Sequence, residues 1–237
     1  MGMGGTLMYV LAIDTSTDAV VTGVARLPAD GAPEVLGDRA VSDGRRHAEV
    51  LTSLIGESLE QASVGRGELE AVVVGCGPGP FTGLRVGMAT GAAFGDALGL
   101  PVYGVCSLDA IAADEWSARE PASILVVTDA RRREIYWATY EQGRRSHGPA
   151  VGAPADVAAE LADASIDVVV GSPAHTGLFG RAIGSAGVPT VAGLVSVAAG
   201  DIRNRAQPEP LVPLYLRRPD AVERAPRRPA QPAEVSR

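Results

Sequence analysis

Two aspartates end apolar segments at equivalent places in the two halves of the chain. Asp14 closes residues 8–14, and Asp129 closes residues 122–129. Together with a hydroxyl such as that of Thr15, carboxylates at strand ends could hold magnesium and phosphate oxygens. An aspartate in this position also commonly hydrogen-bonds the backbone of the following turn. Asp14, Thr15 and Asp129 are therefore candidate phosphate or nucleotide residues, with the turn role as the simpler interpretation.

A glycine- and proline-rich loop, GCGPGP at 75–80, joins an apolar run to a segment of helical period. Loops of this kind can bind phosphate through backbone N–H groups at a helix start. A P-loop, however, requires a lysine, and the chain contains none. A dinucleotide-binding fingerprint that starts at Gly75 would need glycine where Pro80 stands. The loop therefore predicts a weak anion site at most.

Histidine and cysteine form no catalytic or metal-binding pattern. His47, His147 and His175 are too far apart in the sequence for a zinc motif. Cys76 and Cys106 each follow a predicted buried strand, which favours reduced core thiols over a disulfide or a metal pair. We expect no metal site and no catalytic residue.

The composition is that of a globular protein, with 46% hydrophobic and 21% charged residues. No apolar run reaches membrane-spanning length, and the first residues lack the features of a secretory signal. We therefore expect a cytoplasmic protein. The net charge of −7 argues against broad nucleic-acid binding, which draws on clustered cationic side chains, so any contact with RNA is expected to be indirect.

The predicted helix at 80–99 has glycine at every fourth position. These residues are Gly83, Gly87, Gly91, Gly95 and Gly99. Each glycine inside a helix costs about 1 kcal/mol relative to alanine. The repetition therefore indicates that another backbone approaches closely. That backbone could belong to the same chain, as in an ordinary buried helix, or to a partner protein.

A second helix is predicted from residue 43 to residue 63. Its apolar residues recur at the spacing of an amphipathic helix and form one stripe: Val50, Leu51, Leu54, Ile55, Leu59 and Ala62. Glutamates at 49, 57 and 60 lie off the stripe. One face of this helix is expected to be buried.

The order of predicted elements occurs twice. The first half has strands at 8–14, 19–27, 34–41, 71–75 and 101–105, with helices at 43–63, 80–99 and 107–117. The second half has strands at 122–129, 134–140, 145–150 and 168–171, with helices at 154–163 and 194–206. VVVG at 72–75 recurs at 168–171, and Thr-Gly-Leu at 82–84 recurs at 176–178. These echoes predict an internal duplication.

The predicted fold is α/β, with two duplicated β-β-β-α-β-α-β-α domains that face each other across a cleft. The expected domains are 8–110 and 111–206, followed by a segment, 207–218, that docks back on the body. Residues 1–7 and 219–237 are expected to be a disordered leader and a disordered tail. The basic tail could touch RNA, although a solvated tail is the simpler interpretation.

The duplicated unit, with an aspartate at each hairpin tip, resembles the actin, Hsp70 and sugar-kinase (ASKHA) superfamily. The chain is most similar to the bacterial TsaB (YeaZ) family. The motifs that carry this resemblance are LAIDTST at 11–17, Arg-His-Ala-Glu at 46–49, GPGPFTGLRVG at 77–87, TDARRREIYWA at 128–138 and PLYLR at 213–217. The resemblance covers nearly all of residues 8–218.

The resemblance implies a non-catalytic subunit that pairs with its paralogue TsaD and with the ATPase TsaE. Together they install threonylcarbamoyl on an adenosine of tRNAs that read codons beginning with A, and the complex uses ATP. It also implies that residues 45–63 and 80–99 bind TsaD. Without TsaD the same surface could self-associate, because an exposed apolar patch tends to be covered. The expected interface residues are His47, Val50, Leu51, Leu54, Ile55, Phe81, Thr82, Leu84, Gly87, Met88, Gly91 and Gly95.

The chain departs from TsaD at one informative place. TsaD-like proteins carry a metal-binding histidine pair, and an ungapped alignment places these histidines at Ser107 and Ile111. Serine is a poor ligand for a divalent metal and isoleucine is none. Transferase or protease chemistry is therefore not supported. The alternative function is an enzyme that uses ATP in its own cleft through Asp14, Thr15 and Asp129.

Overall fold

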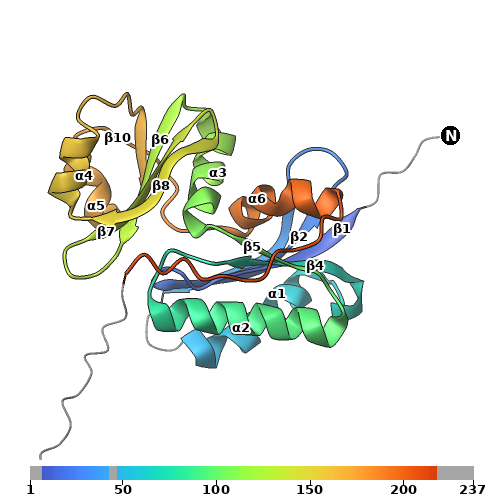
Figure 1. The fold of residues 1–237 in the computed structure, drawn as a ribbon. Coiled ribbons are helices and arrows are strands. Elements are labelled where there is room, and N and C mark those ends of the chain that lie inside the picture. The colour runs from blue at the N-terminus through green and yellow to red at the C-terminus, as the bar shows by residue number, and fades with distance from the viewer. Residues whose placement is uncertain (1–6, 43–46, 218–237) are drawn as a thin grey trace, which may run out of the picture.

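The computed structural model describes residues 7–42 and 47–217, with only the backbone of 47–49. The predicted leader and tail, apart from Leu7, therefore lie outside the described residues. Two five-stranded mixed sheets form the two halves (Figure 1). The first has the order β3-β2-β1-β4-β5, with β1 (Met8–Asp14), β2 (Ala19–Leu27), β3 (Glu34–Ser42), β4 (Leu69–Gly75) and β5 (Val102–Val105). The second has the order β10-β9-β6-β7-β8, with β6 (Ser123–Asp129), β7 (Ile135–Glu141), β8 (Arg144–Gly152), β9 (Val168–Gly171) and β10 (Ala182–Ile183).

The predicted duplication is confirmed by the sheet topology. In each half the first strand, β1 or β6, lies at the centre, antiparallel to the next strand and parallel to β4 or β9. The helices also repeat in order. They are α1 (His47–Ala62), α2 (Phe81–Leu98) and α3 (Ser107–Arg119) in the first half, and α4 (Pro154–Glu160), α5 (Pro173–Thr176) and α6 (Val191–Arg203) in the second. The duplicated α/β fold expected from the sequence is thus the fold of this chain.

The two halves differ in the size of their helical layers. The first half has a 16-residue α1 and an 18-residue α2. Their counterparts α4 and α5 have 7 and 4 residues, and the short 3-10 helix η2 (Gly177–Phe179) continues α5. Another 3-10 helix, η1 (Arg66–Glu68), precedes β4. Within the described residues, only the first half carries a long pair of helices on one face of its sheet (Figure 1).

The last helix of each half packs across the boundary between the sheets. Leu108 and Ile111 of α3 contact Ile124 and Val126 of the second sheet. On the other side, α6 packs against the first sheet and against α3 (Figure 1). The expected domain boundary between 110 and 111 lies inside α3. This exchange of apolar contacts joins the halves through two helices.

The pair α1 and α2 covers the opposite face of the first sheet. Its buried side chains include Leu51, Leu54, Ile55, Leu84 and Met88, which pack against residues of β1 and β4. The glycines of α2 face the same sheet. A Cβ at Gly87 would lie 2.3 Å from Thr15 Oγ1, at Gly91 2.3 Å from Val74 Cγ2, and at Gly95 2.1 Å from Val102 Cγ2. The close approach is therefore to the chain's own sheet.

Some predicted helix boundaries were wrong by a few residues. Pro80 immediately precedes α2 rather than opening it, whereas Gly99 adopts the left-handed C-cap conformation expected at the helix end. The last helix starts at 191, not 194, because the Thr190 hydroxyl accepts a hydrogen bond from Gly193 N and caps it. In the described part of the chain, no helix combines the length and apolar character needed to cross a membrane.

The C-terminal segment runs back from α6 along the first sheet to the second half (Figure 1). Leu214 N donates a hydrogen bond of 2.9 Å to Cys76 O. Arg217 donates to Ala130 O at 2.5 Å and pairs with Glu134 at 3.0 Å. Residues 211–217 therefore touch both halves.

Replacing a helical glycine with alanine usually stabilises a protein, but the close packing of α2 predicts the opposite at Gly91. Gly91→Ala is expected to lower the free energy of unfolding by about 1–2 kcal/mol, because overpacking against Val74 outweighs the gain in propensity. The matched control is Gly56→Ala in α1, where a Cβ would meet nothing within 4 Å. This variant should be more stable by up to about 1 kcal/mol. Urea unfolding measures both, and a Gly91→Ala protein as stable as wild type would contradict the packing argument.

Asp114 of α3 predicts a pH dependence of stability. Its carboxylate accepts a 2.8 Å hydrogen bond from Thr190 Oγ1, and burial raises its pKa from 3.8 to about 6. As pH rises from 4 to 6, the unfolded chain releases this proton before the folded chain does, so the free energy of unfolding falls. An asparagine side chain at this position would not ionise, so it would remove this dependence.

Asp114→Asn should therefore be more stable than wild type at pH 7, by at most about 3 kcal/mol. The difference should shrink as pH falls below 3.8, where Asp114 becomes mostly protonated in the unfolded chain as well as in the folded one. Unfolding curves between pH 3.5 and 7.5 measure it. A constant difference across this range would contradict the assignment.

Candidate functional site

A pocket of about 190 Å³ lies between the two halves. Its polar lining comes from the loop after β1, the end of β3, the end of β6 with the turn that follows, and the start of α5. These residues are Ser16, Thr17, Asp18, Ser42, Thr128, Asp129, Arg131 and Ser172. The predicted cleft therefore exists, although it is small for a nucleotide.

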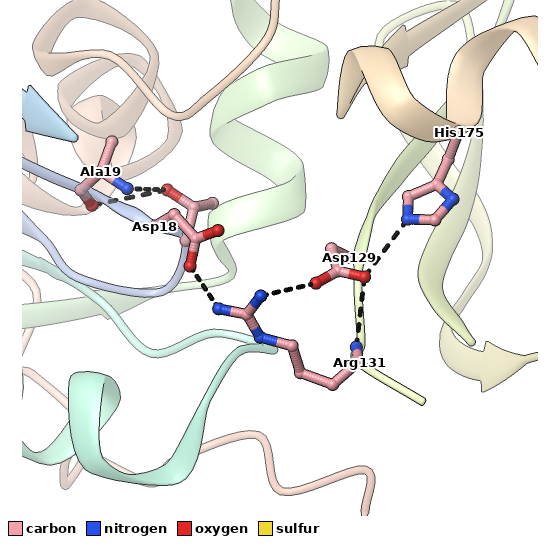
Figure 2. A network of polar contacts seen from close by, with 6 residues as sticks. Asp18, Ala19, Asp129, Arg131 and His175 are labelled. Carbon is pink, nitrogen blue, oxygen red and sulfur yellow. Dashed lines mark hydrogen bonds and ion pairs between the residues drawn. The ribbon is translucent and has the colours of Figure 1, made fainter. Parts of the chain in front are cut away.

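Charged side chains bridge this cleft. Figure 2 shows the Arg131 guanidinium between Asp18 of the first half and Asp129 of the second. Arg131 pairs with Asp18 Oδ1 at 2.6 Å and with Asp129 Oδ2 at 3.3 Å. The other Asp129 oxygen, Oδ1, lies 3.2 Å from His175 Nε2 (Figure 2). Asp129 is thus occupied by the chain's own cation and histidine.

The ion pair between Arg131 and Asp18 contributes little to holding the two halves together. More than half of each side chain is exposed, 58% for Arg131 and 59% for Asp18. Pairs of this kind contribute between 0 and about 1 kcal/mol. The network therefore favours a closed cleft without locking it. Sequence reasoning gave Asp18 and Arg131 no role, although both lie in or beside motifs that support the family resemblance.

Asp14 does not face the cleft, and its side chain is fully buried. Its Oδ1 accepts hydrogen bonds from Ser16 N at 2.8 Å and Ser16 Oγ at 2.7 Å. Its Oδ2 accepts one from Ser107 Oγ at 2.5 Å. Burial raises the pKa of Asp14, and the hydrogen bonds from Ser107 and Ser16 oppose that shift. Both oxygens are thus bonded inside the fold, which agrees with the simpler interpretation that Asp14 bonds the turn after its strand.

Thr15 is also a structural residue. It is fully buried, and its Oγ1 donates to Gly83 O at 2.7 Å and accepts from Gly87 N at 3.1 Å. These bonds attach the end of β1 to the first turns of α2. Thr15 therefore has no free hydroxyl for a phosphate, and only Asp129 of the three candidates lines the cleft.

The glycine-rich loop packs against the chain itself. A Cβ at Gly79 would lie 2.1 Å from Ser16 O, so the two backbones are in direct contact. Gly77 has a φ of +93°, a backbone conformation that residues with a side chain rarely adopt. The loop needs glycine at these two positions because of that contact and that φ.

The remaining candidates for chemistry are not brought together. Among the described residues, no three His, Cys, Asp or Glu side chains could hold a metal ion. His147 stacks on Trp137, whereas His175 contacts Asp129 in the cleft. Ser107 and Ile111 are buried, 1% and 0% exposed, and Ser107 is bonded to Asp14.

The two cysteines are unsuited to nucleophilic chemistry. Both are free and buried, as the sequence predicted. Burial raises the pKa of Cys76 to about 11 and that of Cys106 to about 12. Since the thiolate is the reactive form, neither thiol is a nucleophile at neutral pH.

The predicted interface residues on α1 and α2 divide into buried and exposed sets. The buried set consists of Leu51, Leu54, Ile55, Leu84, Gly87, Met88, Gly91 and Gly95. Assigning these eight to a partner surface was wrong, because they pack against the chain's own first sheet. Val50 is half-buried, and Phe81 and Thr82 are exposed. The side chain of His47 lies outside the described residues.

The face of α2 that points away from the sheet is rich in small side chains. Its exposed residues include Ala89, Ala92, Ala93 and Ala97. The neighbouring helix α1 exposes Thr52, Ser53, Glu57 and Glu60. Small side chains let another helix approach closely. The exposed faces of α1 and α2, called the outer helical face below, form the second candidate site.

The known proteins that this chain resembles include TsaD and TsaB (YeaZ) proteins. A family profile described as "TsaD: tRNA N6-adenosine threonylcarbamoyltransferase" matches residues 37–182. An uncharacterized protein of Mycobacterium tuberculosis H37Rv is 52% identical over 212 residues, which cover 90% of this chain and 93% of the relative. The tRNA threonylcarbamoyladenosine biosynthesis protein TsaB of Escherichia coli K12 is 33% identical over 137 residues, 57% of this chain and 56% of that protein. The solved structure of YeaZ from Pseudomonas aeruginosa matches with a TM-score of 0.67 and 28% identity, over 85% of this chain and 99% of the other.

The two aspartates should respond differently to substitution. Asp14→Ala is expected to lower the free energy of unfolding by about 2 kcal/mol or more, because it leaves buried donors unpaired. Asp129→Ala, which removes partly exposed contacts with Arg131 and His175, should change it by less than about 1 kcal/mol. Urea unfolding measures both, alongside ATP hydrolysis by each purified protein. An ATPase rate that is lost in a normally stable Asp14→Ala protein would restore the nucleotide hypothesis.

Proposed function

We propose that this chain, which belongs to the TsaB (YeaZ) family, acts in tRNA threonylcarbamoyladenosine biosynthesis as a non-catalytic subunit that binds a TsaD-like paralogue. The TsaD-like subunit transfers the threonylcarbamoyl group to N6 of the adenosine next to the anticodon, in tRNAs that read codons beginning with A. A TsaE-like ATPase completes the complex, which uses ATP. This chain binds and activates the TsaD-like subunit in the cytoplasm.

The observation that carries this proposal is the outer helical face. Two long helices lie side by side on the first sheet and expose alanines such as Ala89 and Ala93 rather than a dense charged surface. Helices with small exposed residues pack closely against helices of another subunit. The second half has no comparable layer, since α4 and α5 are short. The outer helical face is therefore the surface best suited to a paralogous subunit.

The state of the cleft supports a non-catalytic role. Asp14, Thr15 and Ser107 are buried and bonded to one another or to the backbone. The cleft carboxylate that remains, Asp129, is paired with Arg131 and His175. No observation favours ATP hydrolysis by this chain alone. Given its net charge of −7, we expect it to contact tRNA through its partners.

Light scattering on size-exclusion peaks tests the partner role. The chain is run alone and mixed with the TsaD-like protein from the same cell. A one-to-one complex that replaces any homodimer is expected. Ala93→Arg should abolish the complex, because a long charged side chain holds the helices apart. Its matched control is Ala159→Arg, an exposed alanine on α4, which should bind as wild type.

Two results would refute this role. The first is a wild-type chain that stays separate from the TsaD-like protein with and without ATP. The second is an Ala93→Arg protein that forms the complex as well as Ala159→Arg does. In a reconstituted reaction with the TsaE-like protein and tRNA, Ala93→Arg should also lose the modification of adenosine.

A further inference from the structure

The described surface exposes aromatic rings at one place. Of the tyrosine, phenylalanine and tryptophan residues in 7–42 and 47–217, only Phe81 and Tyr215 are more than 36% exposed, at 37% and 38%. They come from opposite ends of the sequence, yet they stack on each other. Their ring centroids are 4.8 Å apart and the interplanar angle is 28°. A chain with 4% aromatic residues therefore concentrates its exposed rings in one stack.

Arg85 completes this stack. Its guanidinium carbon lies 3.8 Å from the centroid of the Phe81 ring, in cation–π geometry. Its Nε donates a 3.1 Å hydrogen bond to Tyr215 Oη. Phe81 and Arg85 lie one helical turn apart at the start of α2, and Tyr215 lies on the C-terminal segment. We call these three residues the aromatic anchor.

The aromatic anchor is held in place from both sides. Leu214, next to Tyr215, is bonded to Cys76 O, and Arg217 is bonded to Ala130 O and Glu134. A side chain that is already ordered loses little rotamer freedom on binding. Tyrosine and arginine in rigid positions are also the residue types that dominate binding energy at protein interfaces.

We propose that the aromatic anchor is the principal contact of the outer helical face, and that its occupant is a helix of the TsaD-like paralogue that carries a carboxylate opposite Arg85. The proposal rests on the proposed function and adds the C-terminal segment to the interface. Phe81 and Tyr215 pack on the apolar side of that helix, while Arg85 selects its charge.

Two features of the surface favour this occupant. The aromatic anchor is continuous with the exposed alanines of α2, since Arg85 and Ala89 are one helical turn apart. The guanidinium uses Nε for Tyr215 and has no acidic partner among its described contacts, so its two terminal nitrogens can bind a carboxylate in a fork. RNA would stack on the same rings, but the adjoining alanines of α2 offer no charge to its phosphates.

Binding to the purified TsaD-like protein, measured by calorimetry with full-length variants, tests the proposal. Tyr215→Ala should raise the Kd by about thirtyfold, as loss of an aromatic hot spot does. Its control is Val212→Ala, on the same segment and 64% exposed, which should bind within about twofold of wild type. Tyr215→Phe retains the stack and should bind within about threefold. Thermal unfolding of each variant checks that the segment stays docked.

The expected carboxylate of the partner, opposite Arg85, is tested by removing the charge of Arg85 and by varying the salt concentration. Arg85→Gln should raise the Kd about tenfold and reduce its dependence on salt between 50 and 500 mM. The control is Arg181→Gln in the second half, which should change neither. Normal wild-type binding together with unchanged binding of Tyr215→Ala and Arg85→Gln would overturn the aromatic anchor and leave the proposed function standing. Loss of tRNA binding by these variants, with a normal protein complex, would overturn it in favour of RNA. A wild-type chain that does not bind the TsaD-like protein would refute both proposals.

Discussion

The buried carboxylate of Asp14 is the polar contact on which the first half depends. Moving a carboxylate out of water is costly unless its oxygens are hydrogen-bonded. Here Ser16 and Ser107 supply those bonds, and Gly75 leaves the room, since a Cβ there would lie only 1.7 Å from Asp14 Oδ2. One side chain thus joins the end of β1, the loop after it and the start of α3. Thr15, the next residue, attaches α2 in the same way.

The packing of helices on the two sides of the first sheet determines the character of the outer helical face. Helix α6 from the second half covers one side of the first sheet, and α1 and α2 cover the other. The glycines of α2 bring that helix close to β4 and β5, and Leu84 and Met88 are buried beneath it. The outer side of α2 exposes four alanines, with Phe81 and Arg85 at the start of the helix and Asp96 and Leu98 near its end. The internal packing of α2 therefore sets the character of the surface that we assign to a partner.

Most of the fold was predictable because it follows from local patterns. The echoes of VVVG and Thr-Gly-Leu identified the duplication, and apolar periodicity located nearly all strands and helices. Errors arose where a single side chain decides a boundary, as Thr190 does for α6. The glycine stripe was recognised as a sign of close backbone approach, but periodicity cannot tell which neighbour approaches. Only the position of Val74 beneath Gly91 shows that the neighbour is the chain's own sheet.

The sequence by itself determined the family, the duplicated α/β fold and the absence of a lysine-dependent phosphate site, because motifs, element order and composition are local or additive properties. The tertiary structure decided which residues are available for function. It buried Asp14 and Thr15, left Asp129 in the cleft beside Arg131, and brought Tyr215 to Phe81 across more than a hundred residues. Availability depends on what packs against a side chain in three dimensions. Contacts between residues so far apart in the sequence leave no spacing by which they could have been found.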